Sequence, residues 1–163
     1  MLFRSRVGIH SGRQFRYPDS DEPKRTVWLA EDSKNLYFYR QSRDLHKVDV
    51  CVADTETGDV KVLFEEKLNT YVELQRLELL KSGDMLWWSE RDGWGHLYHY
   101  GKNGKLKRQI TRGSFSVREV MGFDESKQTV YFMANGREEN EDPYLQHLYS
   151  VFIDGTRMKL LNE

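Results

Sequence analysis

Histidines are the first side chains in this 163-residue sequence to test for metal binding or acid–base catalysis. His96 and His99 lie three positions apart in an apolar run, so on a strand they would point to opposite faces and could not share a zinc ion. His96 and His147 occupy equivalent positions of a repeated pattern, which favours packing or hydrogen bonding. The full set is His10, His46, His96, His99 and His147. We predict no metal site.

Serine and carboxylate patterns also fall short of a catalytic or calcium-binding site. A nucleophile elbow needs Gly-x-Ser-x-Gly, and the nearest match, Gly113-Ser114-Phe115-Ser116, lacks the second glycine. Residues 54–59 alternate oxygen-bearing side chains as calcium loops do, but residues 60–64 supply no later glutamate. We therefore predict no catalytic residue and no cofactor in this chain.

Charge and hydropathy exclude several further classes of function. Lys and Arg number 25 against 26 for Asp and Glu, a net charge of −1, which argues against a nucleic-acid partner. No run approaches the roughly 20 apolar residues of a membrane span, and residues 1–6 lack the apolar core of a secretion signal. Cys51, the single cysteine, cannot form an internal disulfide and is expected to be buried.

The sequence contains a pattern that occurs three times, and most of the side chains discussed above lie within it. Each copy has a strand, a polar turn with serine, an apolar strand, a charged loop, another strand, a glycine turn and a last strand. The turns at Ser33, Ser82 and Ser126 are 82 − 33 = 49 and 126 − 82 = 44 residues apart, and the segments 33–39, 82–88 and 126–132 superpose without gaps. The glycine turns are Thr57-Gly58, Asn103-Gly104 and Asp154-Gly155. Both central residues of such turns can take positive φ, which makes them strong hairpin signals.

Four strands repeated every ~40–50 residues are typical of a β-propeller blade. We predict an all-β fold, a partial β-propeller of about three four-stranded antiparallel blades at residues 26–66, 67–112 and 113–163. Residues 1–25 would be a loop or the remnant of a preceding blade. Because propellers typically have about four to eight blades, three do not close a ring. We expect an incomplete domain, or a homo-oligomer that covers the end faces.

The motif around the central tryptophans resembles a known family. Trp88-Ser89-Glu90-Arg91-Asp92-Gly93-Trp94-Gly95-His96-Leu97-Tyr98 is similar to the blade motif of the dipeptidyl-peptidase-IV-like branch of the prolyl oligopeptidase family. Further similar segments follow in the same order, and the resemblance extends over about residues 26–161. It implies the N-terminal propeller of a serine exopeptidase that removes dipeptides from peptide N-termini. Nucleophile, acid and base would lie in a following α/β-hydrolase domain, and the parent would be periplasmic or exported.

The resemblance also suggests substrate-proximal residues. In the family a glutamate pair in a helical insertion binds the substrate amine, but Glu65-Glu66 and Glu138-Glu139 lie outside such a context, so we do not assign them that role. Residues 68–76 correspond to a region near the substrate-facing cavity. We name Tyr71, Glu73 and Arg76 as candidates for contact with a peptide substrate or the hydrolase domain. The alternative is that they are ordinary connecting and inner-strand residues.

Two other functions stay open at the level of sequence. The chain could belong to a stand-alone propeller that binds proteins or ligands, or to a periplasmic carbohydrate- or peptide-binding propeller without a hydrolase partner. A fold does not fix a function. A Gly-x-Ser-x-Gly elbow followed by Asp and His in the parent sequence would separate the peptidase from both.

Overall fold

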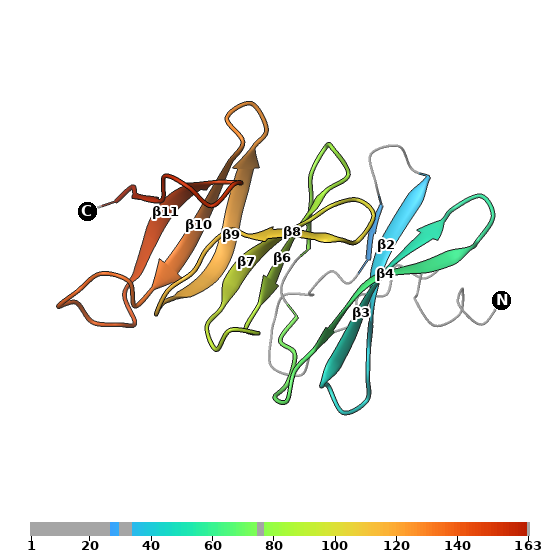
Figure 1. The fold of residues 1–163 in the computed structure, drawn as a ribbon, viewed down its shortest axis with the longest axis horizontal. Helices are drawn as coiled ribbons and strands as arrows, with labels where there is room; N and C mark the ends of the chain where they lie inside the picture. Colours follow the sequence, from blue (N-terminus) through green and yellow to red (C-terminus); the bar gives the residue numbers. More distant parts are fainter. Residues whose placement is uncertain (1–26, 30–33, 75–76, 163) are drawn as a thin grey trace. The chain divides into compact units, whose positions relative to one another are not determined.

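The computed structural model describes residues 27–29, 34–74 and 77–162. In these residues every regular element is a strand, and twelve strands form three four-stranded antiparallel sheets (Figure 1). The predicted all-β fold with three four-stranded antiparallel blades is confirmed. Across the same residues no helix is long and apolar enough to cross a membrane. Residues 1–25, predicted as a loop or blade remnant, lie outside the described part.

The first compact unit, Met1–Tyr71, contains one sheet in the order β1-β2-β3-β4. Its strands are β1 (Val27–Leu29), β2 (Asn35–Gln41), β3 (Lys47–Asp54) and β4 (Val60–Lys67). Phe38, Val48 and Val50 are buried, and Cys51 is fully buried in β3, as predicted. Burial raises the pKa of the Cys51 thiol. The cysteine is thus a packing residue of this sheet.

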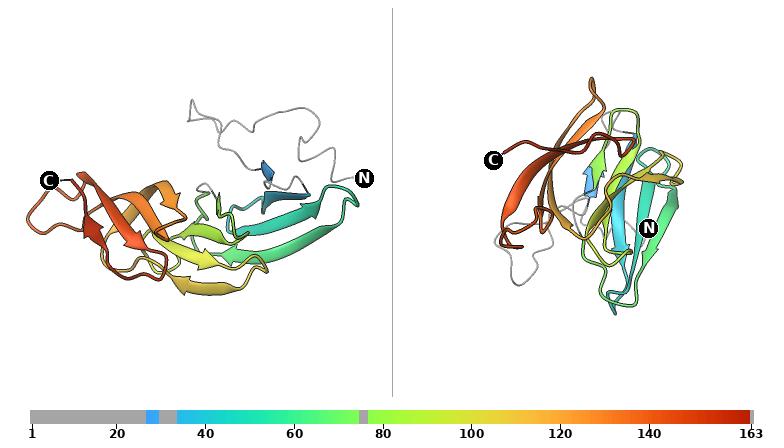
Figure 2. Two further views of the ribbon diagram at one scale, coloured as in Figure 1. Left: turned by 90° about the horizontal axis from the view of Figure 1, so that it is seen from above. Right: turned by 60° about the vertical axis from the view of Figure 1, so that its left-hand side comes forward.

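The second unit, Val72–Glu163, contains two sheets. One comprises β5 (Glu78–Leu79), β6 (Met85–Ser89), β7 (His96–Tyr100) and β8 (Leu106–Gln109). The other comprises β9 (Ser116–Asp124), β10 (Thr129–Asn135), β11 (Gln146–Phe152) and β12 (Lys159–Leu160). Figure 2 shows both sheets as twisted meanders lying beside each other. The strand expected over residues 72–80 is much shorter than predicted, since only β5 forms a ladder. Val72, Leu74 and Leu77 are buried without belonging to it.

A single core joins the two sheets of this unit. All residues of β6 and β7 are buried, which a surface meander would not allow. The core draws on Trp88 and Leu97 from one sheet and on Val117, Phe132 and Tyr149 from the other. Burial of this apolar area from both sheets is what fixes them against each other.

The glycine turns close their hairpins in a different way from the prediction. Gly104 and Gly155 have φ of +79° and +83°, but Asn103 and Asp154 do not take positive φ. Gly104 N–H donates to Gly101 O at 2.8 Å, a turn followed by a glycine bulge. The reason lies in the side chains: Asn103 Oδ1 accepts from Lys105 N at 3.0 Å, and Asp154 Oδ1 accepts from Thr156 N at 2.8 Å. These local hydrogen bonds keep the backbones of Asn103 and Asp154 at negative φ.

Candidate functional site

The three candidate substrate-proximal residues, Tyr71, Glu73 and Arg76, differ in where they lie in the structure. Tyr71 is the last residue of the first unit and is 68% exposed. Its ring lies edge-on to the His46 ring, with centroids 5.6 Å apart. Glu73, at the start of the second unit, is exposed and lies within electrostatic range of Glu90. Arg76 lies outside the described residues. Exposure of Tyr71 and Glu73 suits contact with another molecule but does not by itself assign a role.

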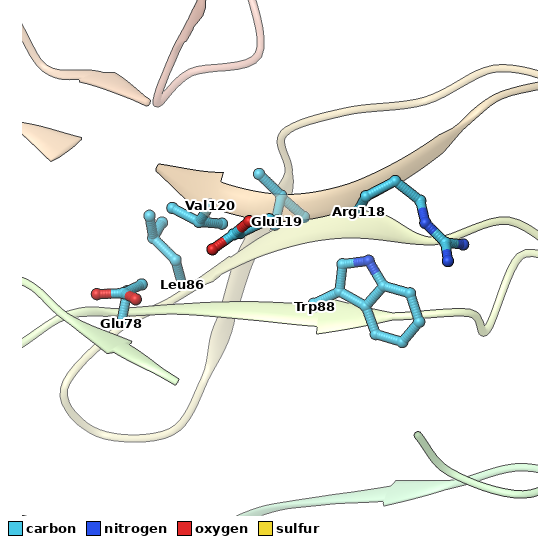
Figure 3. A pocket seen from close by; sticks show the side chains of 7 residues that line it. Glu78, Leu86, Trp88, Arg118, Glu119 and Val120 are labelled. Atoms are coloured by element: carbon cyan, nitrogen blue, oxygen red, sulfur yellow. The ribbon is translucent and has the colours of Figure 1, made fainter. Parts of the chain in front are cut away.

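A cavity of about 220 Å³ lies at the junction of the two sheets in the second unit. Its lining comes from four strands: Glu78, Leu86, Trp88, Leu97, Arg118, Glu119 and Val120. Figure 3 shows Glu78 and Glu119 near the Leu86 end, while Arg118 extends past Trp88 in the other direction. The pocket thus has an acidic end, a basic end and apolar walls.

Irregular pairing of β9 explains why neighbouring residues share this pocket. Its register against β10 shifts twice, so that Arg118 and Met121 are each an extra residue without a partner across the ladder. In a regular strand successive side chains point to opposite faces, whereas a bulge redirects a side chain. Arg118, Glu119 and Val120 consequently line one cavity although they are consecutive.

Charged residues just outside the pocket extend its acidic character. Burial raises the pKa of Glu90, the carboxylate of Glu73 raises it further, and the guanidinium of Arg118 opposes both. Glu90 therefore lies close enough to Arg118 and Glu73 for their charges to act on it. Among the described residues, the carboxylates of Glu73, Glu78, Glu90 and Glu119 and the guanidinium of Arg118 lie in or beside the pocket.

A set of hydrogen bonds that we term the indole clamp fixes the wall of the pocket. Trp88 Nε1–H donates to Val117 O at 2.8 Å, and Val117 N–H donates to Gly95 O at 2.8 Å. Gly95 N–H donates to Ser116 Oγ at 3.3 Å. A Cβ on Gly95 would lie 2.5 Å from Trp88 Cζ2, so only glycine fits beneath the indole. The clamp joins β9 directly to the β6–β7 loop.

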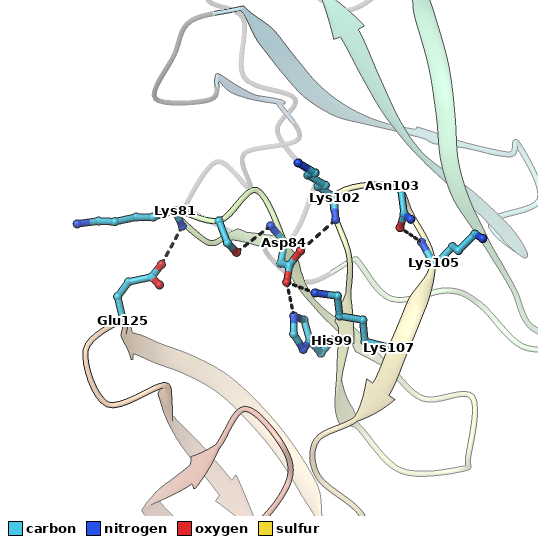
Figure 4. Close-up of polar contacts among 9 residues, drawn as sticks. Lys81, Asp84, His99, Lys102, Asn103, Lys105, Lys107 and Glu125 are labelled. Carbon is cyan, nitrogen blue, oxygen red and sulfur yellow. Dashed lines mark hydrogen bonds and ion pairs between the residues drawn. The ribbon is translucent and has the colours of Figure 1, made fainter.

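A second polar cluster on the same unit has a structural role (Figure 4). Asp84 accepts from Lys107 Nζ at 2.6 Å, from Lys102 N at 3.2 Å, and contacts His99 Nε2 at 2.9 Å. Burial alone would raise the pKa of Asp84, but the bonds from Lys107 and His99 outweigh it and the pKa is lowered. Burial lowers the pKa of His99. The cluster ties the serine turn to β7 and β8.

His96, Glu66 and Glu138 have buried or hydrogen-bonded positions in the described residues. His96 Nε2 lies 3.0 Å from Gly113 O and its Nδ1 lies 3.2 Å from Thr111 Oγ1. Glu138 accepts from Tyr149 OH at 2.8 Å, and Glu66 is buried at 3% exposure. Within residues 27–29, 34–74 and 77–162, no three His, Cys, Asp or Glu side chains are arranged to hold a metal ion.

The sequence reasoning missed the pocket. Glu78 lies on β5 and Glu119 on β9, and their separation of 119 − 78 = 41 residues offered no motif. The signal was the equivalent placement of β5 and β9 as first strands of successive sheets, which brings their side chains to one junction. The bulge that redirects Arg118 has no sequence signature.

A family profile and two curated relatives all relate this chain to dipeptidyl peptidases. The profile of the family described as "Dipeptidyl peptidase IV (DPP IV) N-terminal region" matches residues 16–163. A probable dipeptidyl peptidase 4 of Aspergillus flavus is 32% identical over 134 residues, covering 77% of this chain and 17% of the relative. A probable dipeptidyl peptidase 4 of Emericella nidulans is 24% identical over 137 residues, with the same coverages of 77% and 17%.

Solved structures agree in fold. The dipeptidyl peptidase 4 of Porphyromonas gingivalis superposes with a TM-score of 0.75 at 22% identity, over 83% of this chain and 19% of that one. A putative dipeptidyl aminopeptidase IV from Bacteroides ovatus gives a TM-score of 0.70 at 25% identity, over 82% and 21%. The chain spans about a fifth of the length of these proteins. Because the family profile matches residues 16–163 and the described residues form three four-stranded sheets, the chain belongs to the family of dipeptidyl peptidase IV N-terminal regions.

Proposed function

We propose that this chain is the propeller portion of a serine-type dipeptidyl peptidase, carries no catalytic triad itself, and shapes the access of peptides to the active site. The observation that carries the proposal is the family match over residues 16–163. The partners would be a C-terminal α/β-hydrolase domain of the parent chain and a peptide substrate. The parent would remove dipeptides from peptide N-termini.

The chemistry of the described residues supports a non-catalytic role. Ser114 is exposed in a connecting segment, and the two ring nitrogens of His96 contact Thr111 and Gly113 instead. Burial lowers the pKa of His96, which favours the neutral imidazole. A general base has to reach the proton that it abstracts, and here the ring is engaged by a hydroxyl and a carbonyl.

Two measurements test this proposal. The chain alone should not hydrolyse a Gly-Pro-type chromogenic dipeptide, and the parent should hydrolyse it with a sensitivity to serine-directed inhibitors. The parent sequence should contain a Gly-x-Ser-x-Gly elbow followed by Asp and His. Hydrolysis by the chain alone that Ser114→Ala abolishes would overturn the claim that it lacks a nucleophile. A parent without an elbow would instead favour a stand-alone binding propeller.

Tyr71, Glu73 and Arg76 are proposed to contact the substrate or the hydrolase domain in that parent. Tyr71→Ala and Glu73→Gln should then raise KM for peptides by about two- to tenfold, since each removes one exposed contact. An exposed residue of a glycine turn, Glu56→Gln, is the control. Unchanged KM and kcat in both variants would mean that these residues are ordinary connecting positions.

A further inference from the structure

The β9–β12 sheet has an outer face, which is turned away from the core that it shares with the β5–β8 sheet. Along β10 buried and partly exposed residues alternate, and Phe132 belongs to the shared core. Because successive side chains of a strand point to opposite faces, its neighbours Tyr131 and Met133 lie on the outer face. Leu148 pairs with Met133 across the β10–β11 ladder and lies on the same face. All three outer-face side chains are partly exposed.

Backbone hydrogen bonds show which residues of the β5–β8 sheet are equivalent to this outer face. Ile110 N–H donates to Leu97 O at 2.7 Å, where the chain leaves β8. In the same way Leu161 N–H donates to Leu148 O at 2.8 Å, where the chain leaves β12. In both sheets the side chain of the following residue accepts from the N–H of that same leucine. Leu97 is therefore equivalent to Leu148 (148 − 97 = 51) and Ile110 to Leu161 (161 − 110 = 51).

Cross-strand pairs extend the equivalence to β6 and β10. Trp88 and Met133 pair with these two leucines, so they are equivalent to each other. Two residues earlier on the same strands, Leu86 is equivalent to Tyr131. The four pairs of equivalent residues are Leu86 and Tyr131, Trp88 and Met133, Leu97 and Leu148, and Ile110 and Leu161.

The two sets of equivalent residues differ in burial. On the β5–β8 sheet all four belong to the core shared with the next sheet and are 1% to 6% exposed. On the β9–β12 sheet Leu161 is 41% exposed and the other three are partly exposed. The first set is buried because a four-stranded sheet follows it in the chain. An apolar set in the same arrangement needs a similar partner to remove it from water.

We propose that Tyr131, Met133, Leu148 and Leu161, termed the end face, form the docking surface for a further four-stranded antiparallel sheet of the parent protein. This rests on the proposed function in that the chain is part of a larger propeller. The chain covers 17% of each of the two curated relatives, which leaves length for such a sheet. Since β9 begins 116 − 110 = 6 residues after Ile110, the first strand of the further sheet should begin about six residues after Leu161.

The junction at the end face differs from the junction between the two sheets of the second unit. There Trp88 Nε1–H donates to Val117 O, and Gly95 leaves room for the indole. At the end face Met133 stands in the place of Trp88, and a thioether has no N–H to donate. Gln146 stands in the place of Gly95 (146 − 95 = 51), which fits a position that no indole covers. The further sheet therefore docks through apolar packing, without an indole clamp.

A second copy of this chain fits the end face less well than a sheet of the parent. The partner has to present a face like the one that Phe132 and Tyr149 present to the β5–β8 sheet. The equivalent residues of that sheet, Trp87 and Tyr98, are already 1% and 2% exposed. In the described part of the first sheet Phe38 is 1% exposed. A second copy would have to open its own core to offer either face.

Thiol labelling tests the proposal, because Cys51, the single cysteine of the chain, is fully buried. Met133→Cys and Leu161→Cys each place one thiol on the end face. Lys105→Cys, at an exposed position of the β7–β8 turn, is the matched control. Each variant is made in the 163-residue chain and in the parent, and the labelling rate of that site in the folded protein is followed by mass spectrometry of its peptide. Unchanged thermal unfolding shows that a variant is folded, and the two end-face positions serve as independent probes.

Both end-face thiols should be labelled at least about tenfold more slowly in the parent than in the 163-residue chain, since labelling then requires the further sheet to open. The rate in the chain should not depend on protein concentration, and the protection in the parent should not depend on it either. The control thiol should react equally fast in both proteins.

Three results would overturn the docking proposal. Equal labelling in the chain and the parent would show that no sheet covers the end face. Protection that grows with protein concentration would identify a second copy as the occupant. Slow labelling in the 163-residue chain at every concentration would show that residues of the chain itself cover the face. None of these outcomes involves hydrolysis, so they leave the peptidase assignment standing, whereas that assignment fails when the parent lacks an elbow or does not cleave the chromogenic dipeptide.

Discussion

Replacing Gly95 by alanine tests whether the indole clamp holds the two sheets of the second unit together. The new Cβ would lie 2.5 Å from Trp88 Cζ2 and 2.8 Å from Trp88 Nε1, both well inside contact distance. Trp88 is 6% exposed and hydrogen-bonded to Val117 O at 2.8 Å, so its ring cannot move without losing that bond. The substitution therefore acts through sterics and hydrogen bonding, not through φ.

The expected loss of unfolding free energy in Gly95→Ala has two contributions. Overpacking a filled site costs about 1–3 kcal/mol. If the indole moves away, the carbonyl of Val117 loses its donor in a buried position, which costs about 1–3 kcal/mol more. Gly95→Ala should therefore lower the free energy of unfolding by about 2–6 kcal/mol. That range is several times the usual effect of a surface substitution, about 0.5 kcal/mol.

The assay is urea unfolding followed by far-ultraviolet circular dichroism and tryptophan fluorescence. Gly122→Ala is the matched control, because a Cβ there meets nothing within 4 Å, and alanine in a strand should be neutral or stabilising by about 0.5–1 kcal/mol. Combining Gly95→Ala with Trp88→Leu should cost less than the sum of the single variants, since the second change removes the clashing ring. A Gly95→Ala protein as stable as the wild type, or strictly additive effects, would refute the clamp.

Two further predictions concern pH. The pKa of Asp84 is lower in the fold than in the unfolded chain, so its contribution is present above pH ~4 and is lost as pH falls through the folded-state value. Asp84→Asn should cost about 1–2 kcal/mol at neutral pH and flatten the acid limb of stability measured by urea unfolding from pH 5 to pH 2; an unchanged acid limb would contradict the assignment. Burial, together with the bond to Glu138, raises the pKa of Tyr149 to about 12, so its contribution is present below pH ~10 and is lost as pH rises through the folded-state value. Tyr149→Phe should cost about 1 kcal/mol at pH 7 and reduce the alkaline sensitivity of unfolding, and a wild-type alkaline limb in this variant would refute the role of that hydroxyl.

Most strands could be predicted from the sequence because each is an apolar run that ends at a turn. β6 and β7 show this best: β6 is apolar except for Ser89, β7 consists of His, Leu and Tyr residues, and both strands are completely buried. The short ladder of β5 was not predictable, since Leu74, Leu77 and Leu80 are buried whether or not their backbone pairs. The pattern of apolar residues predicts which side chains are buried, whereas a strand is defined by backbone hydrogen bonds to a neighbouring strand.

Side-chain roles near turns were less predictable than the strands. Trp94 lies in the motif that carried the family resemblance, yet it is 44% exposed while Trp87 is 1% exposed. Trp87 lies within β6, whereas Trp94 lies in the β6–β7 loop directly after Gly93, whose φ is +87°. Aromatic content alone could not distinguish the packing tryptophans from the exposed one.

The gapless superposition of the second and third sequence copies places their apolar strands out of register by one residue. Met85 follows the β5–β6 turn and pairs with Tyr100, which precedes the β7–β8 turn. Val130 follows the β9–β10 turn and pairs with Val151, which precedes the β11–β12 turn. Equivalent residues of these two copies are therefore 130 − 85 = 45 apart, not the 44 residues that separate Ser82 from Ser126. The extra residue is in the turn: Gly83 and Gln128, also 128 − 83 = 45 apart, are the positions with positive φ.

A shift of one residue exchanges the two faces of a strand, and this changes what Trp88 corresponds to. With the spacing of 44, Trp88 would match Phe132, and both belong to one core. With the observed spacing of 45, Phe132 corresponds to Trp87, and Trp88 to Met133. Trp88 and Phe132 thus belong to the shared core from opposite sheets. Because the thioether of Met133 has no N–H to donate, any sheet that packs on that face of β10 has to do so without an indole clamp.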